Sequence, residues 1–128
     1  EYSQGFLVYT YPYDGERTFT LGYQINMRNR FTKKFVPGPS PGSYMITETL
    51  VTPFFKKKRV NNHTVYEMRG LWKVKNDFMG GPFVSYSIFN ENTGQVVTVD
   101  GFVYAPRFEK RNYVRQMEAI LQSLKLEE

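Results

Sequence analysis

The segment VPGPSPG at 36–42 has three prolines within seven residues. It divides the chain into two parts with different predicted secondary structure. Proline lacks an amide N–H and clashes with the preceding helical turn, so neither a helix nor a central strand can run through such a segment. The residues on either side of it must therefore form separate elements. The architecture then depends on what each part can bury.

Before the prolines, the sequence predicts one strand and one helix. Residues 5–13, GFLVYTYPY, are rich in aromatic residues and end at the turn sequence YDGE. Residues 19–35 predict a helix with Thr18 or Thr20 as its N-cap. Its predicted apolar stripe recurs every four residues: Phe19, Tyr23, Met27, Phe31 and Phe35.

After the prolines, the sequence predicts four strands at hairpin spacing, over residues 44–52, 64–74, 83–89 and 95–104. An amphipathic helix is expected over residues 109–125. Consecutive strands with short turns predict an antiparallel meander, and the apolar stripes of both helices need a surface to cover. We therefore expect an α+β two-layer sandwich: an antiparallel sheet of about five strands with two helices on one face.

Length and composition narrow the class of protein. A chain of 128 residues is expected to form a single domain, 1–128, with its own core. It has no cysteine and one histidine, which excludes disulfides, thiol nucleophiles and multi-histidine metal sites. A formal charge of +5 is modest for a dedicated nucleic-acid-binding domain. We expect no cofactor and no metal site.

Alternation along the strands suggests which face of the sheet is free. In residues 64–74, one face carries Trp72 with other apolar residues, which marks it as the core face. Val84, Tyr86 and Ile88 are assigned to the same face. The opposite face is then a candidate shallow binding surface, made of Glu67, Arg69, Ser85, Ser87, Asp100, Phe102 and Tyr104. An ordinary solvated face, or one covered by another part of the protein, explains the same pattern.

The stretch NDFMGGPFVS at 76–85 has two interpretations. Gly80 and Gly81 are expected to supply positive φ at a backbone corner before a strand. Alternatively, they allow a ligand to approach the backbone, and Asn76 and Asp77 are candidate cation ligands. No further acid is spaced to complete a calcium loop, and a phosphate-binding loop would open a helix rather than a strand.

Residues 54–62, FFKKKRVNN, form the densest basic run, which contains the expected hairpin tip. Such a run could contact nucleic acid or anionic lipid, but lysines on an edge strand more commonly hinder strand pairing between molecules. Asp100 and Glu67 are the two acids that alternation could bring together, and Arg69 beside them offers a structural ion pair instead of catalysis.

Four motifs carry a resemblance to a known family: YPYDGERTFT, VPGPSPGSYM, RGLWKVKNDFMGGPFVS and DGFVYAPRFEKRNYVRQMEAILQSLKL. Together they resemble the C-terminal half of the bacterial lipoproteins known as domain of unknown function 4837. The resemblance implies a longer lipoprotein of the cell envelope, periplasmic or at the surface, of which this chain is the C-terminal part. It implies no catalytic residue. The element order is also similar to the PsbP/Mog1 type of α+β sandwich.

Three functions remain open from the sequence. The first is a non-enzymatic envelope domain that binds a protein partner or a surface polymer and contacts the N-terminal half of the protein. Membrane contact is then expected only through a lipid anchor outside this chain, and nucleic acid is not expected as a partner. The second is a hydrolase that uses Asp100 or Glu67. The third is nucleic-acid binding through the basic run.

Overall fold

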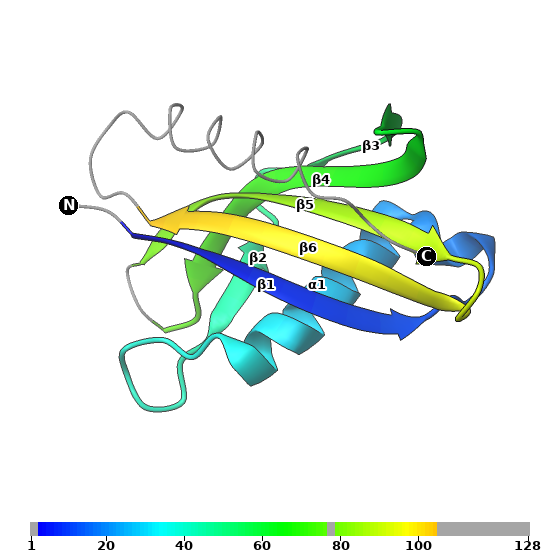
Figure 1. The fold of residues 1–128 in the computed structure, drawn as a ribbon. Coiled ribbons are helices and arrows are strands. Elements are labelled where there is room, and N and C mark those ends of the chain that lie inside the picture. The colour runs from blue at the N-terminus through cyan, green and yellow to red at the C-terminus, as the bar shows by residue number, and fades with distance from the viewer. Residues whose placement is uncertain (1–2, 77–78, 105–128) are drawn as a thin grey trace.

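The computed structural model describes residues 3–76 and 79–104. A short 3-10 helix, η1 (Glu16–Phe19), precedes the single α-helix of this part of the chain. The remaining elements, in chain order, are β1 (Ser3–Pro12), α1 (Leu21–Phe35), β2 (Met45–Glu48), β3 (Phe54–Val60), β4 (His63–Val74), β5 (Gly80–Asn90) and β6 (Gln95–Tyr104) (Figure 1). The helix predicted over residues 109–125 lies outside the described residues.

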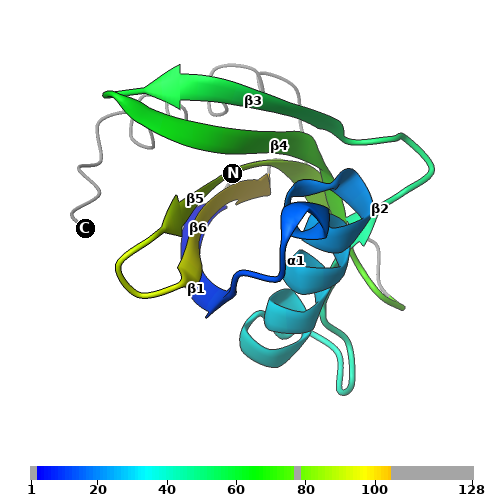
Figure 2. The same ribbon diagram turned by 90° about the vertical axis from the view of Figure 1, so that its right-hand side faces the viewer.

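The six strands form one antiparallel sheet in the order β1-β6-β5-β4-β2, and β3 pairs with β4 as well. β2 and β3 lie one after the other along the same side of β4. Figure 2 shows that the sheet curls into an open half-barrel and that α1 lies against its concave side. The protein is therefore an α+β fold dominated by its sheet, and the predicted antiparallel sheet with a helix packed on it is confirmed.

Strand β3 was not predicted from the sequence. The basic run was expected to contain a hairpin tip, and that tip is Asn61 and Asn62, whose φ angles are 49° and 67°. The lysines themselves lie in the strand before it, which pairs with β4 from Phe54 opposite Arg69 onward. Charged side chains are compatible with a strand here because β3 pairs only with β4 among the described strands, and its Lys56, Lys57 and Arg59 are exposed.

Helix α1 ends at Phe35 as the sequence predicts, but it begins at Leu21, two residues later than predicted. The Thr20 side chain accepts a hydrogen bond from the Tyr23 amide at 3.4 Å, which confirms Thr20 as the N-cap. At the other end, the Val36 amide donates to the Thr32 carbonyl at 2.8 Å. Pro37 follows and prevents a further turn.

The predicted buried stripe of α1 is wrong. The helix residues that are fully buried are polar and also recur every four residues: Gln24, Arg28 and Thr32. The aromatic stripe lies beside them, half-buried against Tyr9, Tyr11 and Val96, and its last member, Phe35, is exposed. On the other flank, Leu21 and Ile25 pack against the cluster around Trp72. The helix therefore presents a polar centre between two apolar margins.

Arg28 is the central residue of this interface. Its Nε donates to Asp100 on β6 at 2.7 Å, and its Nη1 donates to the Thr47 hydroxyl on β2 at 3.0 Å. The guanidinium lies 3.7 Å from the centre of the Phe83 ring on β5. Both members of the ion pair are fully buried. One side chain thus joins the helix to three strands.

The neighbours of Arg28 on α1 extend these polar contacts. Thr32 donates from its hydroxyl to the Met45 carbonyl at 2.8 Å, and Asn29 accepts the Thr47 amide at 2.8 Å. Gln24 donates to the Tyr11 hydroxyl at 2.7 Å and accepts from the Ser87 hydroxyl at 3.0 Å. Within residues 3–76 and 79–104, every buried polar side-chain atom has a partner. A buried polar interface is stable only when it is satisfied in this way.

The assignment of residues to the two sheet faces needs a correction. Ser85 lies opposite Met68 and Asp100, so the serines, Asp100, Phe102 and Tyr104 belong to the concave face with Trp72. Glu67 lies opposite Tyr86 and belongs to the convex face with Arg69. The predicted free surface is therefore split between two faces.

The wrong assignment of residues to the two sheet faces has a physical cause. Residues 83–88 of β5 are all buried, so both faces of this strand are covered and alternation does not separate core from solvent. The concave face is polar where it meets the polar centre of α1. The convex face carries the buried apolar cluster of Val65, Val84, Tyr86, Ile88 and Val99.

Removal of the Arg28 side chain tests the importance of this contact. Arg28→Met leaves the Asp100 carboxylate buried without its partner, and we expect a loss of ~3–5 kcal/mol in the free energy of unfolding. Burial already raises the pKa of Asp100, and Arg28 offsets only part of this effect. Adding Asp100→Asn to Arg28→Met should restore part of the loss. Urea denaturation of both single variants and the double variant measures the coupling; a loss below 1 kcal/mol for Arg28→Met would contradict this account.

Candidate functional site

Of the residues proposed from the sequence as a binding surface, only some come together. Phe102 and Tyr104 meet Trp72 at the end of the concave face, with ring centres 6.2 Å and 6.4 Å from it. Asp100 lies beneath α1 in the ion pair with Arg28. Glu67 and Arg69 are on the other side of the sheet.

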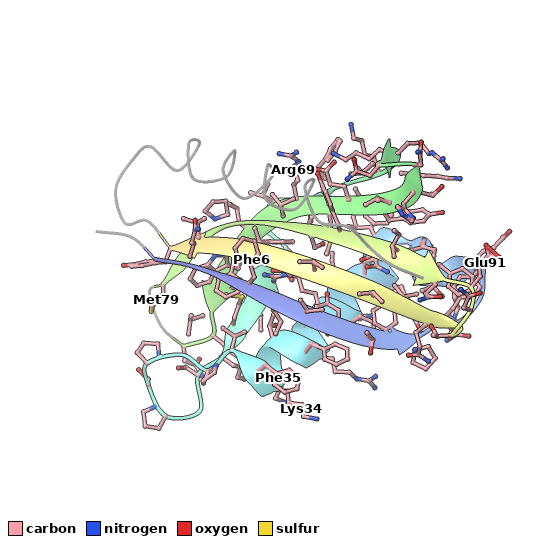
Figure 3. All side chains as sticks on the ribbon, in the orientation of Figure 1. Phe6, Lys34, Phe35, Arg69, Met79 and Glu91 are labelled. Atoms are coloured by element: carbon pink, nitrogen blue, oxygen red, sulfur yellow. The ribbon has the colours of Figure 1, made fainter. Side chains whose placement is uncertain are left out.

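A pocket of about 110 Å³ opens beside these three aromatic residues. It lies at the end of the sheet where Figure 3 labels Met79. Two exposed prolines of the 36–42 segment form its outer edge. Its lining is Val36, Pro37, Gly38, Pro39, Met45, Trp72, Val74, Met79, Phe102 and Tyr104. Apart from the Tyr104 hydroxyl and the Trp72 indole N–H, these side chains offer no polar group, so the pocket suits an apolar group.

The proline segment is held in one conformation by its own hydrogen bonds. The Gly38 amide donates to the Ser43 carbonyl at 2.9 Å, and the Ser43 hydroxyl donates to the Ser40 carbonyl at 2.6 Å. Gly42 turns the chain at φ 79°, and Pro37 and Tyr44 form a β-bridge at the base of the loop. Three prolines further restrict the loop. The edge of the pocket is therefore formed before any ligand arrives, which lowers the entropic cost of binding.

The floor of the pocket is fixed by Trp72. Its indole Nε1 donates to the Val103 carbonyl at 3.0 Å, and the side chain is 4% exposed. The assignment of Trp72 to the core is confirmed. Gly81 makes this bond possible: a Cβ at residue 81 would overlap the Val103 carbonyl oxygen and come within 3.2 Å of the indole nitrogen.

The structure corrects the role expected for the two glycines of NDFMGGPFVS. Both lie in β5, and neither is among the glycines with positive φ in the described chain. They are required for close approach instead, since a Cβ at Gly80 would lie 2.8 Å from the Trp72 carbonyl oxygen. Before them, Asn76 is in the left-handed conformation at φ 68°. Asp77, the other candidate cation ligand, lies outside the described residues.

Glu67 is buried on the convex face and neutralised by two cations. Lys58 lies 3.0 Å from one carboxylate oxygen, and Arg69 donates to the other. Burial acts to lower the pKa of Lys58, but hydrogen bonds to Tyr86 and Glu67 outweigh it and raise this pKa. The structural ion pair expected for Glu67 and Arg69 is confirmed. The expected proximity of Glu67 to Asp100 is wrong, because they lie on opposite faces.

A second hollow, of about 290 Å³, lies at the opposite end of the sheet, where Figure 3 labels Glu91. Its wall contains rings that stack on one another: Phe19 on Tyr66 at 3.9 Å, and Tyr13 on Phe89 at 4.3 Å. Its rim is polar and includes Asn62, His63, Thr64 and Glu91. This hollow is larger and more polar than the pocket beside Trp72.

The roles of the proline segment and of the polar stripe of α1 were not predicted from the sequence. The sequence predicts this segment only as a helix terminator, although it also lines a pocket with residues from two of the three other motifs, the one that contains Trp72 and the one that contains Phe102. The polar stripe at 24, 28 and 32 repeats with the helical spacing that was assigned to the aromatic stripe, so its periodicity was a usable signal.

Two negative findings apply to residues 3–76 and 79–104. No three His, Asp or Glu side chains come together there as a metal site. No helix in that part of the chain has the length and hydropathy required to cross a membrane.

Residues 1–123 match the family described as Domain of unknown function (DUF4837), so the chain belongs to this family. Searches of curated proteins and of solved structures found no match. The family resemblance of the sequence is therefore confirmed.

Replacement of Gly81 tests the close contact with Trp72. Gly81→Ala should destabilise the protein by more than ~1 kcal/mol, because its methyl group displaces the Val103 carbonyl or the indole. The only tryptophan then reports the change as a red shift of its emission. Gly22→Ala is the matched control: nothing lies within 4 Å of its Cβ position in α1, so Ala should stabilise the helix by ~0.5–1 kcal/mol. Equal thermal melting of both variants and wild type would show that residue 81 does not need glycine.

Proposed function

We propose that this domain is a non-enzymatic binding domain of the cell envelope, and that the pocket beside Trp72 receives an apolar side chain from a protein partner. The observation that carries the proposal is the pocket itself: a pre-formed apolar hollow with an aromatic floor and a rigid proline edge. Anchor residues of protein interfaces commonly insert into pockets of this kind. The envelope location rests on the family resemblance of the sequence.

The size of the pocket favours a side chain over a whole small-molecule substrate. Small-molecule sites usually have ~300–1,000 Å³, while a cavity of ~150 Å³ accepts a benzene ring. The pocket beside Trp72, at about 110 Å³, has room for one aliphatic side chain or a small ring. It is open to the surface at the prolines, where a partner can approach.

The state of the two candidate acids supports a non-enzymatic role. Asp100 is enclosed beneath α1 and bound by Arg28, and Glu67 is bound by Lys58 and Arg69. A hydrolase needs a carboxylate within reach of a substrate and free to exchange a proton. Neither carboxylate lines the pocket beside Trp72 or the second hollow.

The arrangement of the basic run gives little support to nucleic-acid binding. Side chains alternate along β3, so Lys56 and Lys58 are on one face, and Lys57 and Arg59 are on the other. Lys58 is already paired with Glu67. Single-strand binders instead combine a continuous basic groove with aromatic platforms.

A titration with small probes tests the proposed site. N-acetyl-leucinamide and N-acetyl-tryptophanamide are added to isotopically labelled protein, and resonances of Trp72, Phe102 and Tyr104 should shift. Met79→Trp fills the pocket and should abolish these shifts, because Met79 lines it. Phe6→Trp is the control: it adds the same ring at an exposed position on β1 that does not line the pocket.

Two outcomes would contradict the proposal. One is an unchanged response in Met79→Trp. The other is a response to neutral oligosaccharides at Asn62 and His63 with none at Trp72, which would assign binding to a surface polymer and to the second hollow.

A further inference from the structure

The corner between β2 and β3 exposes large apolar side chains. Leu50 is 90% exposed and Val51 is 58% exposed, both in the loop after β2. Phe54, the first residue of β3, is 52% exposed, and Leu71 on β4 is partly exposed beside them. Glu48 is the strand partner of Leu71, which places Leu71 next to the loop. We call Leu50, Val51, Phe54 and Leu71 the apolar corner.

The apolar corner is held in place. The Glu48 carboxylate accepts the Leu50 amide at 2.8 Å, and its other oxygen lies 3.3 Å from the Lys73 ammonium. The hydrogen bond from the Leu50 amide is the main reason that the pKa of Glu48 is lowered. At the far end of the loop, Pro53 is buried against Gly70. The loop is therefore anchored at both ends while Leu50 and Val51 point into solvent.

The charge of the chain is concentrated next to this corner. Residues 48–74 contain six Lys or Arg and two Glu, a formal charge of +4 out of +5 for the whole chain. Both acids are paired, Glu48 with Lys73 and Glu67 with Lys58 and Arg69. Lys56 and Lys57 are exposed, and the Lys56 ammonium lies 5.7 Å from the centre of the Phe54 ring. Apolar side chains thus lie beside a basic strand in which Lys56 and Lys57 form no ion pair with an acid of residues 3–76 and 79–104.

We propose that the apolar corner inserts into the headgroup region of an anionic lipid bilayer while the lysines of β3 contact the lipid phosphates. Two contributions to the free energy of membrane binding add in this arrangement: burial of the exposed apolar side chains and attraction between the basic strand and the anionic surface. Lys56 is two residues from Phe54, about 7 Å along the strand, and its flexible stem lets the ammonium stay at the phosphate level.

The apolar residues distinguish this partner from other polyanions. Nucleic acid would use the lysines but would leave Leu50 and Val51 in water, whereas a bilayer uses both. The inference is independent of the pocket beside Trp72, which lies at the proline segment. Membrane contact was expected only through an anchor outside the chain, and the apolar corner provides a contact made by the chain itself.

The test measures partition of the 128-residue protein onto phosphatidylcholine vesicles with and without phosphatidylglycerol. Partition should require phosphatidylglycerol and weaken with added salt. Leu50→Ser with Val51→Ser should lower it about tenfold or more. Lys56→Gln with Lys57→Gln should lower it as well. Val8→Ser, at a 61% exposed valine on the far edge strand, and Lys33→Gln with Lys34→Gln on α1 are the matched controls and should leave it nearly unchanged.

A second measurement reports insertion without removing the lysines. The chain has no cysteine, so Leu50→Cys can be labelled uniquely with an environment-sensitive dye. Its emission should shift to the blue on addition of phosphatidylglycerol vesicles, and the same dye at Val8→Cys should not respond. Equal loss of partition in Val8→Ser, or a dye at residue 50 that stays in water, would overturn the proposal. So would binding to single-stranded DNA that is insensitive to the serine variants, or self-association through residues 50 and 51 without vesicles.

Discussion

The fold depends on a guanidinium placed between a helix and a sheet. Arg28 is bound by Asp100, donates to Thr47 and lies over the Phe83 ring, so strands β6, β2 and β5 share one contact with α1. A charge buried in this way is costly unless it is fully satisfied, so the neighbouring helix positions are polar too. The apolar residues of α1 are displaced to its two margins, where they pack against separate clusters on the sheet.

The same contact sets the limit of sequence-based prediction. The sheet, the helix, its N-cap and the buried Trp72 follow from periodicity and turn residues, and the structure agrees with them. The predicted face of α1 and the predicted faces of β5 and β6 are wrong because periodicity and alternation locate an apolar interior, whereas the interior between α1 and the sheet is polar. Ser85, Ser87 and Asp100 were predicted on a solvent-exposed face, although all three are buried on the concave face, where Ser87 contacts Gln24 and Asp100 contacts Arg28. Only the strand register pairs Asp100 with the concave face, and register requires the folded chain.

The pocket could be predicted only in part. Phe102 and Tyr104 were candidates from alternation, but nothing in the sequence joins them to prolines more than sixty residues earlier. Strand β4 makes that connection, since it pairs with β2 after the proline loop and carries Trp72 toward the end of β6. A backbone constraint at Gly81 was predicted correctly. The constraint is close approach to the Val103 carbonyl and not a positive φ angle.

The connectivity of the sheet also determines the order in which the elements of the protein can fold. In the described part of the chain, β1 pairs only with β6, and Arg28 pairs with a residue 72 positions later. During synthesis, the first strand and the helix therefore emerge long before their partners exist. Contacts of such large sequence separation are slow to form because the intervening chain must be closed first. The hairpins of β3 to β6 can form locally, so β1 and α1 are expected to dock last, onto a sheet that is already formed.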